Sequence, residues 1–184
     1  MILLKNFPIG LHTTWLSEAQ QHIDDPHCKN WLLDKGSLTQ RLQSHCRQFS
    51  VEVLGQQPAQ LHNDEWQVLA GDADTGDDFQ VREVLLCGED TPWVFARSII
   101  PNALLDSELV NLGNRPLGHL LFSDSRFQRM PFELTQLTLG NPLLPSLGLQ
   151  GHHSLWGRRS VFAFQQHKLL VAEVFLPHAP IYRY

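Results

Sequence analysis

The chain has 184 residues, of which 42% are hydrophobic and 18% are charged, and its formal net charge is -5. This size fits one domain, and the composition is typical of a folded protein with a hydrophobic core, which argues against a disordered chain. The acidic balance excludes a general nucleic-acid or anionic-membrane partner, because both require a basic surface. We therefore expect a single domain over residues 1–184. A small anionic ligand remains compatible with the acidic balance, because its binding requires only a few cations in a pocket.

The sequence shows no sign of export or membrane insertion. Its first apolar run is too short for the core of a signal peptide, and no stretch approaches the roughly 18 apolar residues of a membrane-spanning helix. Cys28, Cys46 and Cys87 are an odd number without the spacing of a disulfide framework, so we interpret them as reduced thiols. We expect a cytoplasmic protein, with a monomer as the default.

The first fifty residues carry mainly helix signals. We predict a short helix over residues 17–23 and a second helix over residues 38–46, for which Ser37 is the N-cap. The apolar segment over residues 31–33 ends at residues 34–36, which form a stop signal for regular structure. Residues 49–54 alternate apolar and polar side chains and predict a strand.

The middle of the chain contains the clearest pattern. Residues 55–78 are rich in Gln, Asp and Gly and predict a loop, with one short element around residues 66–69. Residues 79–87 and 93–100 then read as two strands, joined by a turn at residues 88–91. Together they predict a β-hairpin.

Two short helices are expected after this hairpin. Asp106 or Ser107 caps the first, which ends at Gly113. Pro116 favours the first turn of a helix, so the second runs from residue 116 to residue 122.

The last third of the chain predicts a long loop and a second hairpin. Residues 137–154 are rich in Gly, Pro and Leu, whereas residues 159–165 and 169–176 read as paired strands that end before Pro177. Strands joined by tight turns form antiparallel sheets. We therefore predict an α+β fold with a single antiparallel sheet and helices packed on one face.

Three ionisable residues lie inside apolar strands: Arg82, Arg97 and Glu173. Taken singly, each is expected to point outward, because charges are rarely buried without partners. The two arginines together favour another interpretation. If the turn pairs Cys87 with Pro92, Arg82 faces Arg97, and like charges directly opposite are destabilising unless solvent or an anion separates them. A bulge would break this register.

An anion site on the sheet is the functional interpretation of the two arginines, because a guanidinium binds both oxygens of a carboxylate at once. Glu173 either offsets the arginines as a buried ion pair or acts on a ligand, as an acceptor when ionised or a donor when neutral. Leu38 and Leu117 open predicted helices, where unpaired amides favour carboxylates, although every helix has such an end.

Other sites find no support in the sequence. The ten histidines lack zinc-ligand spacing, and there is no phosphate-binding glycine loop, dinucleotide fingerprint or nucleophile elbow. The residues therefore offer no motif for a metal or an organic cofactor.

The sequence resembles the chorismate pyruvate-lyase family from about Trp31 to Tyr182. The matching blocks occur in family order: WLLDKGSLTQRL (31–42), VREVLLC (81–87), PWVFARSIIP (92–101), RPLGHLLF (115–122), LWGRRS (155–160) and LLVAEVFLP (169–177). The resemblance implies a single antiparallel sheet, helical flaps over a buried site and a cofactor-independent lyase. Such an enzyme splits chorismate into 4-hydroxybenzoate and pyruvate for ubiquinone biosynthesis.

The resemblance also implies roles for individual residues. Arg82 matches the arginine that binds the ring carboxylate, and Leu38 and Leu117 match positions whose backbone amides contact the same group. Glu173 matches the glutamate that contacts the 4-hydroxyl, and Arg97 matches a second arginine suited to the enolpyruvyl carboxylate. Arg82, Glu173 and Arg97 are therefore the expected catalytic residues.

Two departures from the family are visible. Leu38 stands where methionine is expected, although a backbone contact should survive that change, and residues 135–154 look longer than usual. The alternative function is a non-catalytic domain of the same fold that senses small anions. The absence of a DNA-binding module and the complete set of matching residues favour the enzyme.

Overall fold

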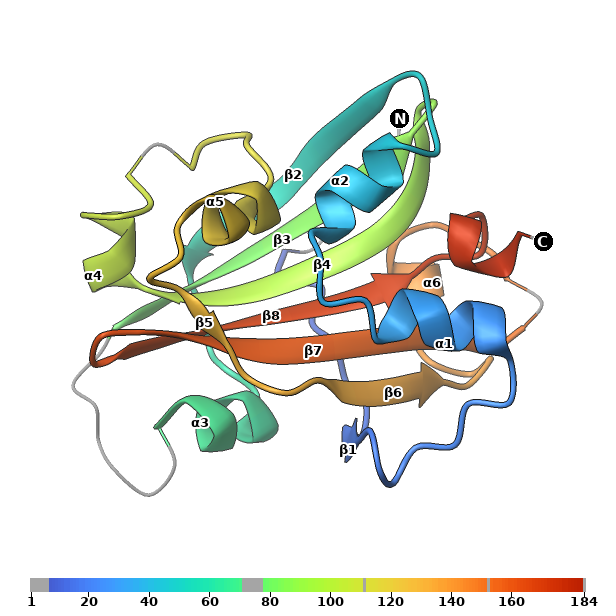
Figure 1. Cartoon of the computed structure of the whole chain (residues 1–184), viewed down its shortest axis with the longest axis horizontal. Coiled ribbons are helices and arrows are strands. Elements are labelled where there is room, and N and C mark those ends of the chain that lie inside the picture. Colours follow the sequence, from blue (N-terminus) through green and yellow to red (C-terminus); the bar gives the residue numbers. More distant parts are fainter. Residues whose placement is uncertain (1–6, 71–77, 111, 152, 184) are drawn as a thin grey trace.

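The computed structural model describes residues 7–70, 78–110, 112–151 and 153–183. Its elements follow one another around a single sheet (Figure 1). The strands are β1 (Leu16–Ser17), β2 (Phe49–Pro58), β3 (Phe79–Gly88), β4 (Thr91–Pro101), β5 (Gln128–Arg129), β6 (Glu133–Leu137), β7 (Leu155–Phe164) and β8 (His167–Phe175). The helices are α1 (Pro26–Leu32), α2 (Leu38–Gln43), α3 (Asn63–Ala70), α4 (Asn102–Leu105), α5 (Leu117–Ser123), α6 (Leu143–Ser146) and the 3₁₀ helix η1 (Pro180–Tyr182).

The sheet has eight strands in the order β1-β6-β7-β8-β4-β3-β2, with β5 paired to β7. Each of these pairs is antiparallel. The predicted α+β class with one antiparallel sheet is confirmed, and so are both hairpins, β3–β4 and β7–β8. Among the described residues, no helix is long and apolar enough to cross a membrane.

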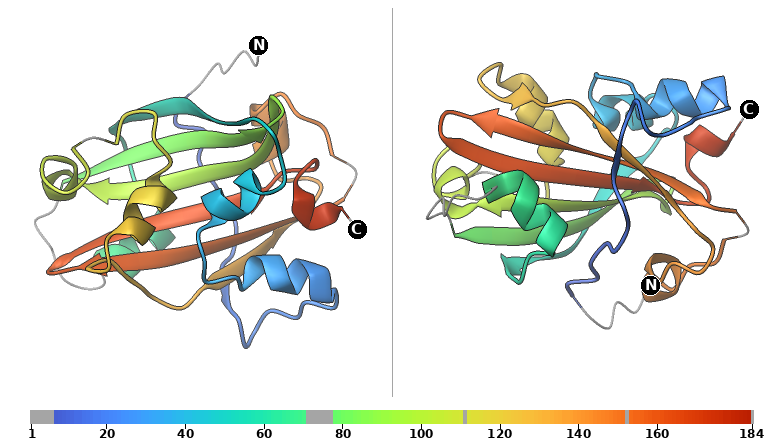
Figure 2. Two further views of the ribbon diagram at one scale, coloured as in Figure 1. Left: turned by 45° about the horizontal axis from the view of Figure 1, so that its top comes forward. Right: turned by 90° about the horizontal axis from the view of Figure 1, so that it is seen from below.

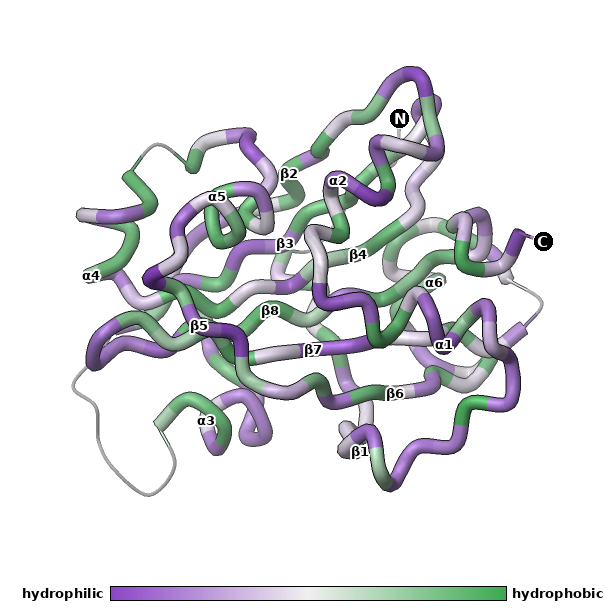
Figure 3. The backbone as a smooth tube through the Cα atoms, viewed as in Figure 1, coloured by the Kyte–Doolittle hydropathy of each residue, from purple (hydrophilic) through white to green (hydrophobic). Residues whose placement is uncertain are grey.

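Side chains alternate between two faces of this sheet. We call the face that carries Arg82, Val84 and Glu173 the front face, and the face that carries Glu83 and Arg97 the back face. Hydrophobic residues dominate the central strands, and hydrophilic stretches interrupt β3 and β7 (Figure 3). These stretches are where charged residues enter the sheet.

Helices lie on both faces rather than on one. Helices α1, α2 and α5 pack on the front face, and α3 and α6 lie on the other side of the sheet (Figure 2). In α6, Leu143 and Leu144 join back-face residues such as Leu85 and Phe95 in one hydrophobic cluster. The prediction of helices on one face was therefore incomplete, because α6 lies in a segment that was expected to be a loop, and α3 lies where only one short element was expected.

The N-terminal half differs from the prediction in three places. Residues 17–23 contain the end of β1 and a turn rather than a helix, and the first helix begins instead at Pro26, where Asp25 accepts a 2.8 Å hydrogen bond from the His27 amide. Strand β2 continues to Pro58, with a register shift after Val53. The segment around residues 66–69 forms the full helix α3.

The C-terminal half differs at its element ends. Helix α4 follows Pro101 directly, whereas the predicted helix from residue 106 to Gly113 is a series of turns in its described part. Strand β7 begins at Leu155, four residues before the predicted start at Arg159, and it pairs with β6, which the sequence did not reveal.

Candidate functional site

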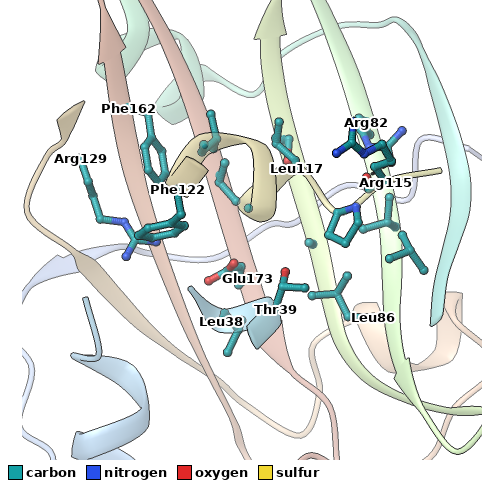
Figure 4. Close-up of a pocket in the computed structure, with 18 residues that line it drawn as sticks. Leu38, Thr39, Arg82, Leu86, Arg115, Leu117, Phe122, Arg129, Phe162 and Glu173 are labelled. Atoms are coloured by element: carbon teal, nitrogen blue, oxygen red, sulfur yellow. Dashed lines mark hydrogen bonds between the residues drawn. The ribbon is translucent and has the colours of Figure 1, made fainter. Parts of the chain in front are cut away.

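A pocket lies between the front face of the sheet and the first turns of α2 and α5 (Figure 4). Its wall is apolar apart from a few charged groups, a composition common in small-molecule sites. The lining residues include Leu38, Thr39, Arg82, Val84, Ala96, Ser98, Arg115, Leu117, Gly118, Phe122, Arg129, Phe162 and Glu173. The pocket thus contains Leu38, Arg82, Leu117 and Glu173 from the predicted site, but not Arg97.

The predicted pairing of Arg82 with Arg97 was wrong. Cys87 does face Pro92, but the register shifts at the next pair, so that Leu86 faces Val94 and Trp93 is the extra residue. Such a β-bulge moves every later residue by one position, and therefore to the other face. Arg82 consequently faces Ser98.

Arg97 lies on the back face in a buried ion-pair network. Its Nε and Nη2 donate hydrogen bonds of 2.6 and 3.0 Å to the two carboxylate oxygens of Glu65, and its Nη1 donates a 2.9 Å bond to Glu83. Glu83 in turn accepts bonds from the backbone amides of Ile9 and Gly10. Arg97 therefore joins the N-terminal segment and α3 to the sheet, and its charge is already balanced.

Arg82 is a buried cation whose hydrogen bonds go to neutral acceptors. The residue is 2% exposed, and its guanidinium donates to Gln56 Oε1 at 2.8 Å and to the Arg115 carbonyl at 3.2 Å. In the part of the chain that the structure describes, no ion pair balances its charge, and burial lowers its pKa. A buried charge without a counter-ion is costly, so this position is suited to an anion.

Glu173 lies at the middle of the pocket (Figure 4). It faces Arg158 across β7 and β8, and Arg158 Nε donates a 2.8 Å hydrogen bond to Glu173 Oε2. Arg158 Nη1 donates to three carbonyls around the end of α1, those of Trp31, Leu32 and Asp34. The ion pair thus fixes one carboxylate oxygen of Glu173, whereas Oε1 accepts no hydrogen bond from the described residues.

Arg129 brings a further cation to the pocket from β5. Its guanidinium stacks within 4.9 Å of the ring centroids of Phe122, Phe132 and Phe162. Its Nη1 donates a long 3.4 Å bond to the Lys35 carbonyl, and its buried Nε finds no hydrogen-bond partner among the residues that the structure describes. Burial, as the largest effect, lowers its pKa to about 10, against the opposing influence of Glu173.

The first turns of α2 and α5 face this pocket from two sides. Ser37 caps α2 by accepting a 3.3 Å bond from the Gln40 amide, and Pro116 precedes α5 without a side-chain cap. Leu38 and Leu117, the first residues of these helices, both line the pocket. Their amides belong to the unpaired first turn, where the helix dipole favours an anion.

Arg129 and Arg158 were not recognised from the sequence as pocket residues. Arg158 and Arg159 are adjacent in the block LWGRRS, so strand alternation places only one of them on the front face, and the pattern does not say which. Arg129 follows a segment for which no strand was predicted. Among the described residues, no group of three or more His, Cys, Asp and Glu side chains is placed to hold a metal ion.

The family model and the curated relatives that match this chain point to the same family. The family model described as Chorismate lyase matches residues 10–184. A protein of Pseudoalteromonas atlantica named probable chorismate pyruvate-lyase is 45% identical over 96% of this chain and 93% of its own length. A protein of the same name from Shewanella amazonensis is 43% identical over 96% of this chain and 94% of its own length.

Solved structures with a similar fold are more distant. The effector domain of PhnF from Mycobacterium smegmatis gives a TM-score of 0.55 with 11% identity, over 78% of this chain and 90% of that domain. The C-terminal domain of the histidine utilization repressor from Pseudomonas syringae pv. tomato gives a TM-score of 0.55 with 9% identity. This match covers 71% of this chain and 92% of that domain. At these identities the likeness concerns the fold alone.

Proposed function

The chain belongs to the chorismate lyase family, and on this premise we propose that its front-face pocket binds chorismate and releases 4-hydroxybenzoate and pyruvate. The observation that carries the proposal is Arg82, a buried guanidinium without a described counter-ion. The site that it forms fits the ring carboxylate of the substrate.

The order of charged groups on the sheet supports this placement. Arg82 is on β3 and Glu173 on β8, and one strand, β4, separates them. Neighbouring strands are about 4.8 Å apart, so the two backbones are about 10 Å apart across the sheet. A six-membered ring fits between side chains at this separation, with its carboxylate toward Arg82 and its para hydroxyl toward Glu173.

The backbone amides of Leu38 and Leu117 supply further donors to the ring carboxylate in this proposal. Both residues open helices at the pocket wall, and neither contact depends on the side chain. The leucine at position 38, where methionine was expected, is compatible with such a contact.

The reaction needs orientation and charge stabilisation more than a strong nucleophile. The ether bond between ring carbon 3 and oxygen breaks, the hydrogen on ring carbon 4 is lost, and the enolpyruvyl methylene gains a proton to become the methyl group of pyruvate. The ring becomes aromatic, and this stability drives the elimination. The pocket contributes by fixing the substrate and excluding water, and Glu173 Oε1 accepts the hydrogen bond of the 4-hydroxyl.

Arg97 has no direct part in this proposal, because both of its carboxylate partners lie on the back face. We further propose that the protein acts as a cytoplasmic monomer without a metal or organic cofactor, and that its product serves ubiquinone biosynthesis. These points rest on the family resemblance and on the three free cysteines.

The experiment that tests the function is a product assay. Purified protein is added to chorismate in the presence of a chelator, and 4-hydroxybenzoate and pyruvate are measured by chromatography. Equimolar products above the spontaneous rate are expected. Saturable binding of chorismate without products would instead assign the chain to the sensing class.

A further inference from the structure

The pocket contains more arginine side chains than carboxylates that could pair with them. Among the described residues, Arg158 is paired with Glu173, but neither Arg82 nor Arg129 forms an ion pair. Arg82 and Arg129 lie toward opposite ends of the pocket, with Glu173 between them (Figure 4). The pocket is therefore lined by a buried arginine, Arg82, and a half-buried arginine, Arg129, whose charges the described side chains do not balance.

The surroundings of Arg129 indicate a position that is prepared for an anion. Three aromatic rings hold the guanidinium plane, so little conformational entropy is lost when it binds a ligand. Its buried Nε has no hydrogen-bond partner in the described part of the chain, and such groups require an explanation. A ligand oxygen in the pocket would satisfy it.

From this geometry we infer that Arg129 is the residue that binds the enolpyruvyl carboxylate, the role first assigned to Arg97. The inference rests on the proposed function. Chorismate carries two carboxylates, one on the ring and one on the enolpyruvyl group. Three lining arginines form no ion pair among the described residues, and of these Arg115 is exposed, which leaves Arg82 and Arg129 as the two cations that are withdrawn from solvent. The enolpyruvyl ether is attached beside the carbon that bears the 4-hydroxyl, so its carboxylate lies on the Glu173 side of the ring, away from Arg82.

The strand order agrees with this assignment. Along the sheet, β3 carries Arg82, β8 carries Glu173, and β5 pairs with β7 on the far side of β8. Arg129 faces Phe162 in that pair, and both residues line the pocket. The protein thus presents cation, carboxylate and cation in the order in which chorismate presents ring carboxylate, hydroxyl and enolpyruvyl carboxylate.

The assignment also gives Arg129 a part in the chemistry. Negative charge develops on the departing enolpyruvyl group when the ether bond breaks, and a fixed guanidinium at its carboxylate stabilises that charge without reorganisation. The product 4-hydroxybenzoate has no second carboxylate. Arg129 should therefore affect chorismate strongly and 4-hydroxybenzoate weakly.

The test compares Arg129→Met with wild type for both ligands. We expect kcat/KM for chorismate to fall about 30-fold or more, as for the loss of a desolvated charge contact. The dissociation constant of 4-hydroxybenzoate should stay within about threefold of the wild-type value, because this ligand makes no contact with the lost charge. Arg126→Met is the matched control, since Arg126 is an exposed arginine that stacks on Phe164 outside the pocket.

A conservative variant guards against loss of folding. Arg129→Lys keeps the charge but not the planar fork. Its kcat/KM for chorismate should fall less than that of Arg129→Met, and its dissociation constant for 4-hydroxybenzoate should likewise stay close to the wild-type value. Normal chorismate kinetics in Arg129→Met, or equal losses for both ligands in the folded variant, would overturn the assignment. If wild type itself forms no product, the proposed function fails, which is a different result from an active wild type with an unaffected Arg129→Met.

Discussion

The guanidinium of Arg158 joins Glu173 to the end of α1. Its Nε donates a 2.8 Å hydrogen bond to Glu173 Oε2, and its Nη1 donates a 2.9 Å hydrogen bond to the Asp34 carbonyl. Asp34 lies just before Ser37, the N-cap of α2. The arginine therefore fixes both the carboxylate at the centre of the pocket and the segment that leads into the helix above it.

Removal of this arginine should damage stability and activity together. In Arg158→Met, Glu173 loses its buried partner, and truncation of one member of a buried pair costs about 3–5 kcal/mol. We expect the free energy of unfolding in urea to fall by that amount and kcat for chorismate to fall with it. Arg126→Met, which removes an exposed arginine, should change neither, and an unchanged urea midpoint in Arg158→Met would contradict the role given to the pair.

Arg97 should behave as a structural residue. Arg97→Met leaves Glu65 and Glu83 buried without their cation, so the free energy of unfolding should fall by about 3–5 kcal/mol. The folded fraction at low temperature should nevertheless bind 4-hydroxybenzoate with the wild-type dissociation constant, measured by calorimetry. A large loss of affinity in folded protein would return Arg97 to the site.

We expect helices α2 and α5 to separate during each turnover, so that ligands can enter and leave the pocket. A Cβ atom at Gly118 would lie 3.4 Å from the Thr39 hydroxyl, so these first turns are close enough for an engineered disulfide. The double variant Thr39→Cys, Gly118→Cys should lose about tenfold or more of its turnover when oxidised, because a closed cover blocks exchange of ligands. Reductant should restore the rate.

Each single cysteine variant controls for the substitutions themselves and should respond little to oxidant. Cys28 and Cys87 of the natural chain are buried, whereas Cys46 is partly exposed and is therefore replaced by alanine in every variant to prevent a competing disulfide. Equal rates for the oxidised and reduced double variant, with the disulfide verified by mass spectrometry, would show that the two helices need not part.

Stability should decline in alkaline solution because of the buried thiols. Burial raises the pKa of Cys28 to about 12 and that of Cys87 to about 11, from 9.0. Between pH 9 and 11 the unfolded chain releases these protons and the folded chain retains them, so the free energy of unfolding falls as the pH rises. The slope approaches about 1.4 kcal/mol per pH unit for each thiol.

Urea unfolding at pH 8 and pH 10.5 measures this loss. Cys87→Ala removes one titrating group and should make the decline shallower by the share of one thiol. Stability that is constant over this interval in the natural chain would mean that the thiols ionise in the folded state.

Local patterns predicted much of the fold and only part of the site. Both hairpins follow from strand alternation and turn residues, and the family resemblance found from the sequence is confirmed. The arginine register failed because Trp93 is bulged: its ring covers Gly88 so closely that a Cβ atom there would overlap it. Nothing in the alternation of apolar residues marks such a position.

The remaining site residues depend on contacts between distant segments. Arg129 reaches the pocket only because β5 pairs with β7, and Arg158 is separated by more than a hundred residues from the carbonyls that it binds near Asp34. Periodicity describes one element at a time, so it places neither arginine. Strand and helix-start patterns, together with the family resemblance, had singled out Arg82, Glu173, Leu38 and Leu117, and all four line the pocket.

The central claim is that Arg82 binds the ring carboxylate, and the most direct measurement is a calorimetric comparison of two ligands on two proteins. 4-Hydroxybenzoate and its neutral amide are titrated into wild type and Arg82→Ala, with folding checked by circular dichroism. We expect wild type to prefer the carboxylate by about 2–5 kcal/mol and the variant to lose this preference. A folded Arg82→Ala protein that still prefers the carboxylate by the wild-type margin would contradict the central claim.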